Sequence, residues 1–434
     1  MKITNILERI NDILASNMPI ISYADEIETL LKEITDEQLL SQTVNLIRGK
    51  VQLEACRAVI ANGGRGIVAM ATGAGKSKVG IMLAEHYMKN TSLKTGKIGL
   101  LVPTQKLRDE NWKEEFYHWD KAELWEKVDR NCYASASKVS DRIYPIAILD
   151  EGHNITELSS SFFDNNEVEN VVILTATPPE SEDKKILLSE RNLRVVYHLS
   201  LENAIKLGFV APYDITVIKV PLNEVDKNVK AGSKTKPFMT TEKASYSYLD
   251  TEIKFLSENY MQLGMADRNK KRFLELTRMN LIYKLKSKTE AAKYLIENVI
   301  PKEDRFLTFC GSKEQADSLG EHRFHSSSGS KSYNLFKEGK INELHCVKAI
   351  NEGHNLPNVD CGIIVQINSK QKDILQRIGR LIRFRPGHKA KVFIIVAEGT
   401  QDEVWLNSAL EGTNQERVSY YGFEKYKALQ ESLV

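Results

Sequence analysis

GIVAMATGAGKSKVGI, residues 66–81, joins an apolar run to a glycine-rich turn and then to a second amphipathic stretch. The run Ile67–Ala71 predicts a buried strand, and the residues after Ser77 predict a helix. A loop that cradles phosphates needs glycines so that backbone N–H groups can turn inward, a lysine for the phosphates and a hydroxyl for Mg²⁺. We therefore expect the turn to bind ATP through Thr72, Gly73, Ala74, Gly75, Lys76 and Ser77.

One residue departs from the strict form of such a loop, because Met70 stands where its first glycine belongs. A glycine-rich turn that only begins a helix is therefore the alternative interpretation of this stretch alone. A second element favours the phosphate loop. The apolar strand Ile143–Leu149 ends in Asp150-Glu151-Gly152-His153.

Two adjacent carboxylates at the end of a buried strand are costly unless a cation pairs with them or chemistry uses them. We expect Asp150, with the Ser77 hydroxyl, to hold Mg²⁺ and Glu151 to polarise the attacking water. Lys76, Asp150 and Glu151 are thus the catalytic residues predicted in the first half of the chain.

The wider pattern alternates short apolar runs with helical stretches, which predicts buried parallel sheets of the doubly wound α/β type. The expected strands are 67–71, 98–102, 143–149, 171–175, 305–310, 344–348, 362–367 and 392–397. A lysine-rich, largely helical stretch, residues 222–300, interrupts the series once, and residues 229–237 within it are expected to form a loop. The sequence therefore predicts two α/β domains joined by a helical, basic insert.

The N-terminal residues predict a small helical unit instead. Apolar residues recur at helical spacing, with Ser22 as an expected cap and Thr35 and Gln38 as an expected capping box. The expected domains are a helical N-terminal unit, a first α/β domain, the insert and a second α/β domain with C-terminal helices, at residues 1–45, 46–221, 222–300 and 301–434.

Composition excludes several classes of protein. The 434 residues are 42% hydrophobic and 27% charged, as in ordinary globular proteins, and no stretch approaches the ~20 apolar residues of a membrane span. The N-terminus lacks a signal-peptide pattern, and the five cysteines are scattered singly, which argues against a disulfide framework or a structural zinc site. We expect a cytoplasmic protein with no membrane partner.

The net charge of +2 indicates little about binding partners, but the distribution of charge along the chain indicates more. Residues 1–45 carry 3 Lys/Arg against 8 Asp/Glu, whereas residues 226–290 carry 14 against 8. A polyanion would therefore favour the second region.

The motifs stand in the order found in superfamily 2 helicases of the DExH type, and the resemblance covers roughly residues 48–410. Besides the loop and Asp150–His153, they are Gln52, 102–107, 175–178, 306–312, 352–357 and 376–383. The last, Gln376-Arg377-Ile378-Gly379-Arg380-Leu381-Ile382-Arg383, is the most specific. Asn355 departs from the family, in which an aspartate is more usual.

The resemblance implies two RecA-like domains with ATP and Mg²⁺ at their shared cleft. Gln52 would read adenine, although an ordinary surface glutamine is nearly as good an interpretation, and Gly353 would contact the nucleotide. Gln376, Arg380 and Arg383 would be catalytic, with the two arginines, on one helical face, acting as fingers on the γ-phosphate. His153 would couple the Mg²⁺ site to the other motifs.

The resemblance also implies contacts with the nucleic-acid backbone. They would come from Pro103, Thr104, Gln105, Thr175, Thr177 and Gly311. The basic run Arg268, Lys270, Lys271 and Arg272 is a further candidate, for which a solvated helix face is an equal alternative.

The motifs look most like those of phage-encoded DNA branch-migration helicases of the UvsW type. We therefore expect an ATP-dependent DNA helicase or translocase that remodels forks or Holliday junctions in recombination, replication or repair. It would act as a monomer without sequence preference, in the host cytoplasm if phage-encoded. The alternatives are a duplex translocase of the restriction-motor type that does not separate strands, an RNA helicase, and an ATP-gated clamp.

Overall fold

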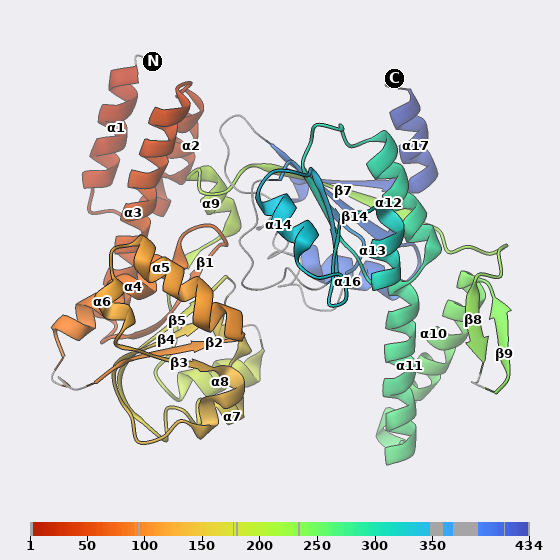
Figure 1. The fold of residues 1–434 in the computed structure, drawn as a ribbon, viewed down its shortest axis with the longest axis horizontal. Coiled ribbons are helices and arrows are strands. Elements are labelled where there is room, and N and C mark those ends of the chain that lie inside the picture. Colours follow the sequence, from red (N-terminus) through yellow and green to blue (C-terminus); the bar gives the residue numbers. More distant parts are fainter. Residues whose placement is uncertain are drawn as a thin grey trace. The chain divides into compact units, whose positions relative to one another are not determined.

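The computed structural model describes residues 3–91, 93, 96–176, 178, 181–232, 235–347, 359–367, 389–411 and 413–432. The chain divides into two compact units, with the change between Pro212 and Tyr213 (Figure 1). Each unit contains one parallel sheet with helices around it. The prediction of two α/β domains is confirmed.

Three helices open the first unit: α1 (Ile3–Ala15), α2 (Ala24–Lys32) and α3 (Glu37–Ala61). The N-cap of α3 is Asp36, whose carboxylate accepts the Leu39 N–H at 2.7 Å, and Ser22 lies inside a short 3₁₀ turn. Both expected caps are therefore wrong, because the Asp36 carboxylate caps α3 and Tyr23, without a side-chain cap hydrogen bond, precedes α2. The expected boundary at residue 45 falls inside α3, which carries the helical unit directly into the α/β domain.

The first sheet has the order β3-β2-β4-β5-β1-β6, and all its neighbouring strands run parallel. Its strands are β1 (Arg65–Met70), β2 (Ile98–Val102), β3 (Val128–Cys132), β4 (Ile143–Asp150), β5 (Glu167–Thr175) and β6 (Val195–Leu199). The central strands are almost wholly buried, as expected when helices cover both faces of a sheet. This order brings the carboxyl ends of β1, β2, β4 and β5 to one edge.

Helices connect these strands. They are α4 (Lys76–Lys89), α5 (Trp112–His118), α6 (Ala122–Trp125), α7 (Glu157–Ser160), α8 (Glu182–Ser189) and α9 (Leu201–Lys206). A five-residue π-helix, Leu107–Asn111, directly precedes α5.

The second sheet has the order β11-β12-β10-β13-β14-β7-β15, again parallel throughout. Its strands are β7 (Tyr213–Val220), β10 (Phe306–Phe309), β11 (Arg323–Phe324), β12 (Glu343–Cys346), β13 (Cys361–Ile364), β14 (Ala390–Ala397) and β15 (Val418–Gly422). The helices of this unit beyond the insert are α12 (Lys286–Asn298), α13 (Lys313–Leu319), α14 (Lys331–Lys337), α16 (Gln401–Leu410) and α17 (Phe423–Glu431).

Two expected boundaries are corrected by this sheet. We placed residues 213–221 in the first domain, but β7 pairs with β14 over its whole length, from Tyr213 opposite Ala390 to Val220 opposite Ala397. We placed residues 286–300 in the insert, but Ala291, Ala292 and Leu295 of α12 belong to the core of the second sheet. Strand pairing decides the first boundary and apolar packing decides the second. The insert therefore comprises only the residues between β7 and α12.

Within the insert, α10 (Glu242–Glu258) and α11 (Met265–Tyr283) form a helical hairpin that extends away from the second sheet in Figure 1. Leu249, Ile253, Leu256 and Leu274 form its small core. Part of the expected loop at residues 229–237 lies instead in strands, because β8 (Val229–Gly232) pairs antiparallel with β9 (Pro237–Thr240). In the part of the chain that the structure describes, no helix is long and apolar enough to span a bilayer.

Candidate nucleotide and nucleic-acid sites

The glycine-rich turn lies between β1 and α4, at the carboxyl edge of the first sheet. Gly73 and Gly75 have φ values of 89° and 85°, in the left-handed region that glycine adopts at little cost. Gly75 is the N-cap of α4, so the first free N–H groups of the helix adjoin the turn. This is the geometry of an anion-binding loop at a helix N-terminus.

The Lys76 side chain folds back over this turn. Its Nζ donates to the Met70 carbonyl at the end of β1, at 3.1 Å. Met70, at the position of the missing glycine, therefore contributes its backbone oxygen and holds the ammonium at the edge of the sheet.

Gln52 lies in the middle of α3 and is 2% exposed, so it is no ordinary surface glutamine. Its Nε2 donates to the carbonyls of Ala74 and Gly75, both at 3.4 Å. A Cβ at Gly75 would lie 2.3 Å from the same Nε2. The structure thus places Gln52 against the phosphate loop, and its contact with adenine stays a prediction.

Asp150 ends β4 at the same edge. Its Oδ2 accepts the indole N–H of Trp112 at 2.9 Å, and its Oδ1 accepts the Glu151 N–H at 3.0 Å. The Tyr133 hydroxyl donates to the Asp150 carbonyl at 2.9 Å. Two side chains and one backbone group therefore fix the orientation of this residue.

Burial, and after it the charge of Glu151, raise the pKa of Asp150 to about 7, while Trp112 and Lys76 act in the opposite direction. Two crowded carboxylates at a buried edge favour a nearby cation. Asp150 and the Ser77 hydroxyl at the start of α4 are therefore the residues that fit Mg²⁺, which prefers oxygen ligands.

Glu151 has a left-handed backbone, with φ 49°, which is uncommon for a residue with a side chain. Gly152 follows it, and a Cβ there would lie 2.1 Å from Cγ2 of Ile173. Glu151 Oε2 lies 3.4 Å from His153 Nδ1 and has no hydrogen-bond partner among the described residues. The turn thus presents a half-buried carboxylate oxygen that could orient a water molecule.

The predicted backbone contacts of the first unit lie at the same edge. Pro103, Thr104 and Gln105 follow the end of β2, and Thr104 Oγ1 accepts the Leu107 N–H at 3.4 Å. Thr175, the last residue of β5, is buried. The sheet topology therefore brings these segments to one edge with Lys76 and Asp150, as is common for ligand sites in open α/β sheets.

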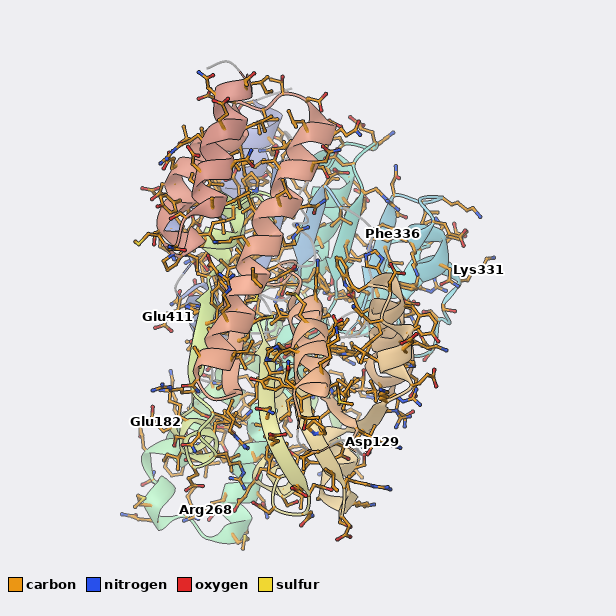
Figure 2. The ribbon with its side chains drawn as sticks, turned by 90° about the vertical axis from the view of Figure 1, so that its left-hand side faces the viewer. Asp129, Glu182, Arg268, Lys331, Phe336 and Glu411 are labelled. Atoms are coloured by element: carbon orange, nitrogen blue, oxygen red, sulfur yellow. The ribbon has the colours of Figure 1, made fainter. Side chains whose placement is uncertain are left out.

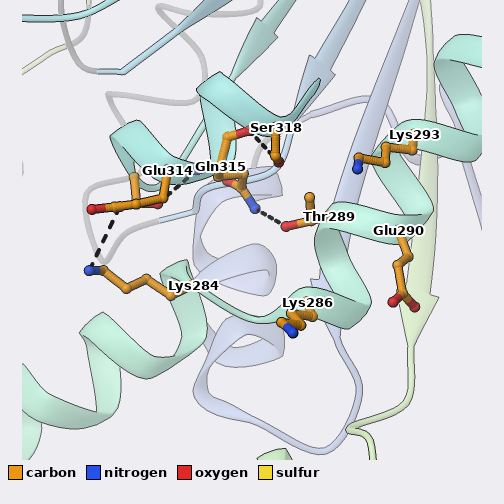
Figure 3. Close-up of a pocket in the computed structure, with 9 residues that line it drawn as sticks. Lys284, Lys286, Thr289, Glu290, Lys293, Glu314, Gln315 and Ser318 are labelled. Atoms are coloured by element: carbon orange, nitrogen blue, oxygen red, sulfur yellow. Dashed lines mark hydrogen bonds and ion pairs between the residues drawn. The ribbon is translucent and has the colours of Figure 1, made fainter. Parts of the chain in front are cut away.

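In the second unit, Gly311 follows β10. Its N–H donates to Gln315 Oε1 at 2.8 Å, and a Cβ there would lie 2.6 Å from the Tyr283 carbonyl. Beside it, residues of α12 and α13 line a cavity of about 490 Å³ (Figure 3). Lys284, Lys286 and Lys293 line this cavity together with Glu290 and Glu314, and Lys284 pairs with Glu314 at 3.8 Å.

The basic run lies in the first two turns of α11, and Arg268 projects from the helical hairpin in Figure 2. Lys270 pairs with Glu252 at 3.0 Å, and Lys271 pairs with Glu275 at 3.4 Å. Part of this charge is therefore balanced on the surface of the insert, and a role in nucleic-acid binding stays a prediction.

Several predicted site residues lie outside the described residues. They are Thr177, Gly353, Gln376, Arg380 and Arg383. Two neighbours of Asp150, Trp112 and Tyr133, lie 38 and 17 positions away along the chain. The sequence showed Trp112 only as the tryptophan behind the segment 102–107, without its contact to Asp150, and it did not single out Tyr133.

Two family models match parts of the chain. Residues 45–142 match the type III restriction enzyme res subunit, and residues 287–385 match the helicase conserved C-terminal domain. A curated relative, the DNA 3'-5' translocase XPB2 of Sulfurisphaera tokodaii, is 22% identical over 401 residues, which cover 85% of this chain and 87% of the relative.

Solved structures share the fold at low identity. The Pyrococcus furiosus Hef helicase domain has a TM-score of 0.52 at 15% identity, covering 83% of this chain and 97% of its own. S. cerevisiae Dbp5 bound to RNA and ADP BeF3 has a TM-score of 0.51 at 11% identity, covering 88% and 92%. The type ISP restriction-modification enzyme LlaBIII bound to DNA has a TM-score of 0.53 at 15% identity, covering 86% of this chain and 31% of its own.

These likenesses establish the tandem RecA-like fold, whereas the assignment to the phage UvsW type stays a prediction. The two model matches, the translocase relative and the two parallel sheets together support placing the chain among the superfamily 2 helicases.

Proposed function

We propose that the chain is an ATP-driven motor that moves along DNA and remodels branched DNA such as forks and Holliday junctions. The observation that supports it best is the carboxyl edge of the first sheet. There the loop 72–77, Lys76 and the Asp150–Glu151 pair adjoin the segment 103–105. A lysine and two carboxylates at the edge that also carries the segment predicted to contact nucleic acid suit hydrolysis coupled to nucleic-acid binding.

The residues of the first unit divide the work on ATP. Backbone N–H groups of Thr72–Ser77 and the ammonium of Lys76 bind the phosphates. Ser77 and Asp150 hold Mg²⁺, which when bound neutralises charge on the β- and γ-phosphates. Glu151, with a free carboxylate oxygen among the described residues, orients and deprotonates the attacking water.

The arginines of the motif 376–383 complete the reaction in this proposal. Arg380 and Arg383 supply positive charge to the γ-phosphate as it leaves, and Gln376 positions the water or the phosphate. Gly353 contributes a backbone contact to the nucleotide.

DNA is proposed as the partner because the curated relative is named a DNA translocase and the restriction enzyme LlaBIII was solved with DNA. Dbp5, solved with RNA, shares the same fold, so RNA is the alternative substrate. Contacts to phosphates by Thr104, Gln105 and Gly311 would give sequence-independent, salt-dependent binding. Branched DNA would then be selected by its shape.

ATP turnover in the presence of different nucleic acids tests the proposal. We expect turnover to rise with single-stranded DNA, forks and Holliday junctions more than with RNA, and Lys76→Ala to abolish it while DNA binding persists. Lys89→Ala, in the last turn of the same helix and paired with Glu85, is the matched control. Wild-type turnover in Lys76→Ala, or stimulation by RNA alone, would contradict the proposal.

A duplex translocase that leaves strands paired is the second candidate. The match to a restriction-enzyme subunit and the name of the curated relative favour it. A strand-displacement assay beside a triplex-displacement assay separates the two functions, because a pure translocase removes the third strand of a triplex without separating the duplex.

A further inference from the structure

Trp112 contacts both the helix that follows the glycine-rich turn and the carboxylate of Asp150. It is the first residue of α5, and its side chain is buried, with 2% exposed. A Cβ at Gly80 of α4 would lie 3.1 Å from its Cη2, so the ring packs directly on the helix that begins at Lys76. The ring of Phe116 also lies near it, with ring centroids 6.1 Å apart.

The polar end of this ring meets a carboxylate rather than a backbone carbonyl. A buried indole N–H needs an acceptor, and here the acceptor is Oδ2 of Asp150 at 2.9 Å. The Glu151 N–H occupies Oδ1 at 3.0 Å, so the carboxylate plane is fixed by two donors. A group that orients a ligand carboxylate in this way tunes the affinity of a metal site.

Trp112 is also joined to the segment expected to contact nucleic acid. Pro103, Thr104 and Gln105 follow β2, the π-helix Leu107–Asn111 comes next, and Trp112 begins α5 without a break. A π-helix holds an extra residue in its turn, and short π-helices recur at functional sites. A change in the winding of this turn would rotate α5, and with it the indole donor.

We propose that Trp112 is a positioning residue that orients Asp150 for its cation and transmits DNA binding at residues 103–105 to that carboxylate. The inference rests on the proposed function and deepens it, because it names the residue that joins DNA contact to the Mg²⁺ site. A tryptophan that only fills the core would pack on Gly80 without any such effect.

Trp112→Phe tests this role because it keeps an aromatic ring and removes the donor. Trp125→Phe is the matched control, since Trp125 is also buried and packs on Phe116, with ring centroids 5.5 Å apart. The first readout is the Mg²⁺ concentration that supports binding of a fluorescent ATP analogue. We expect Trp112→Phe to raise it at least about tenfold and Trp125→Phe to leave it near the wild-type value.

The second readout needs no turnover. With ¹⁵N-labelled indoles, the four tryptophans give four N–H resonances, and the one lost in Trp112→Phe identifies Trp112. We expect this resonance to move when single-stranded DNA is added without nucleotide and again when Mg²⁺ and ATP analogue are added.

Equal Mg²⁺ dependence in the two variants would overturn the orienting role, and an indole resonance indifferent to DNA would overturn the transmission. Either result would leave the proposed function standing if the wild-type protein hydrolyses ATP in response to DNA. A wild-type protein that binds ATP analogue and shows the Trp112 shifts, but gains no turnover with DNA, would contradict the proposed function alone.

Discussion

The carboxyl edges of the two parallel sheets carry different chemistry. In the first unit this edge holds Lys76, Asp150 and Glu151 beside a glycine-rich turn. In the second unit the described part of this edge holds Gly311 and a cavity lined by three lysines and by Glu290 and Glu314. One fold therefore occurs twice, and among the described residues the paired carboxylates beside a glycine-rich turn belong to the first unit.

The arginines of the motif 376–383, in the second half of the chain, offer the strongest test of the hydrolysis chemistry proposed for the site. An arginine finger contributes on the order of 10³–10⁵-fold to turnover. We expect Arg383→Ala to lower ATP turnover by at least about 10³-fold with ATP binding intact, measured in single-turnover hydrolysis. Arg323→Ala, an exposed pair with Asp317, should be unaffected, and a wild-type rate in Arg383→Ala would discredit the finger.

Glu151→Gln tests the chemistry assigned to the first unit. Removal of a general base costs roughly 10²–10⁴-fold, so turnover should fall by that factor while the protein still binds ATP. Equilibrium binding of a fluorescent ATP analogue, measured beside turnover, separates the two effects. Glu157→Gln, on the exposed part of α7, is the control, and equal rates in both variants would remove Glu151 from the mechanism.

Each sheet also buries a titratable group, and in the second sheet this group is His345 on β12. Both ring nitrogens lack hydrogen-bond partners in the described structure, with the Glu343 carboxylate 4.0 Å from Nε2. Burial, and secondarily the charge of His322, lower the pKa of His345 to about 4. The histidine of the unfolded chain therefore binds a proton before the buried ring does. The free energy of unfolding is fully retained above the unfolded pKa and decreases as the pH falls from about 6.5 towards 4.

We therefore expect His345→Leu to lose less stability on acidification than the wild-type protein does. The difference in the free energy of unfolding between pH 7 and pH 5 should shrink by about 2 kcal/mol, from urea unfolding at both values. His118→Gln, on an exposed part of α5, should keep the wild-type difference. The same loss in His345→Leu as in the wild-type protein would show that the buried ring does not resist protonation.

The smallest expected effect concerns the cavity in Figure 3. Lys286 and Lys293 line it, and neither forms an ion pair within the described residues. If both contact phosphates, the double variant Lys286→Ala, Lys293→Ala should reduce the slope of log affinity against log salt by about 1–2. Lys254→Ala, paired with Asp250, is the control, and an unchanged slope in the double variant would place the DNA elsewhere.

Sequence predicted the centre of each sheet well and its edges poorly. Strands such as Ile98–Val102 are continuous apolar runs because helices cover both faces. The edge strands Val128–Cys132 and Val195–Leu199 contain polar or exposed residues, and no strand was expected at either place. The strand Tyr213–Val220 was not expected, and its residues were placed in the first domain, because the sequence does not show which sheet this segment joins.

The candidate site was likewise predicted only in part. Local motifs placed Lys76 and Asp150 on a turn and at a strand end, which the structure brings to one sheet edge. The Trp112–Asp150 hydrogen bond and the burial of Gln52 against Gly75 depend on packing between distant segments. No local pattern contains that information.

Displacement of the third strand from a DNA triplex tests the motor claim most directly, because it requires movement along DNA and not binding alone. We predict displacement with ATP and Mg²⁺, none with a non-hydrolysable analogue, and none with Glu151→Gln. Displacement that is equally fast without ATP hydrolysis, or absent while ATP is turned over on DNA, would contradict the claim that the protein is a motor.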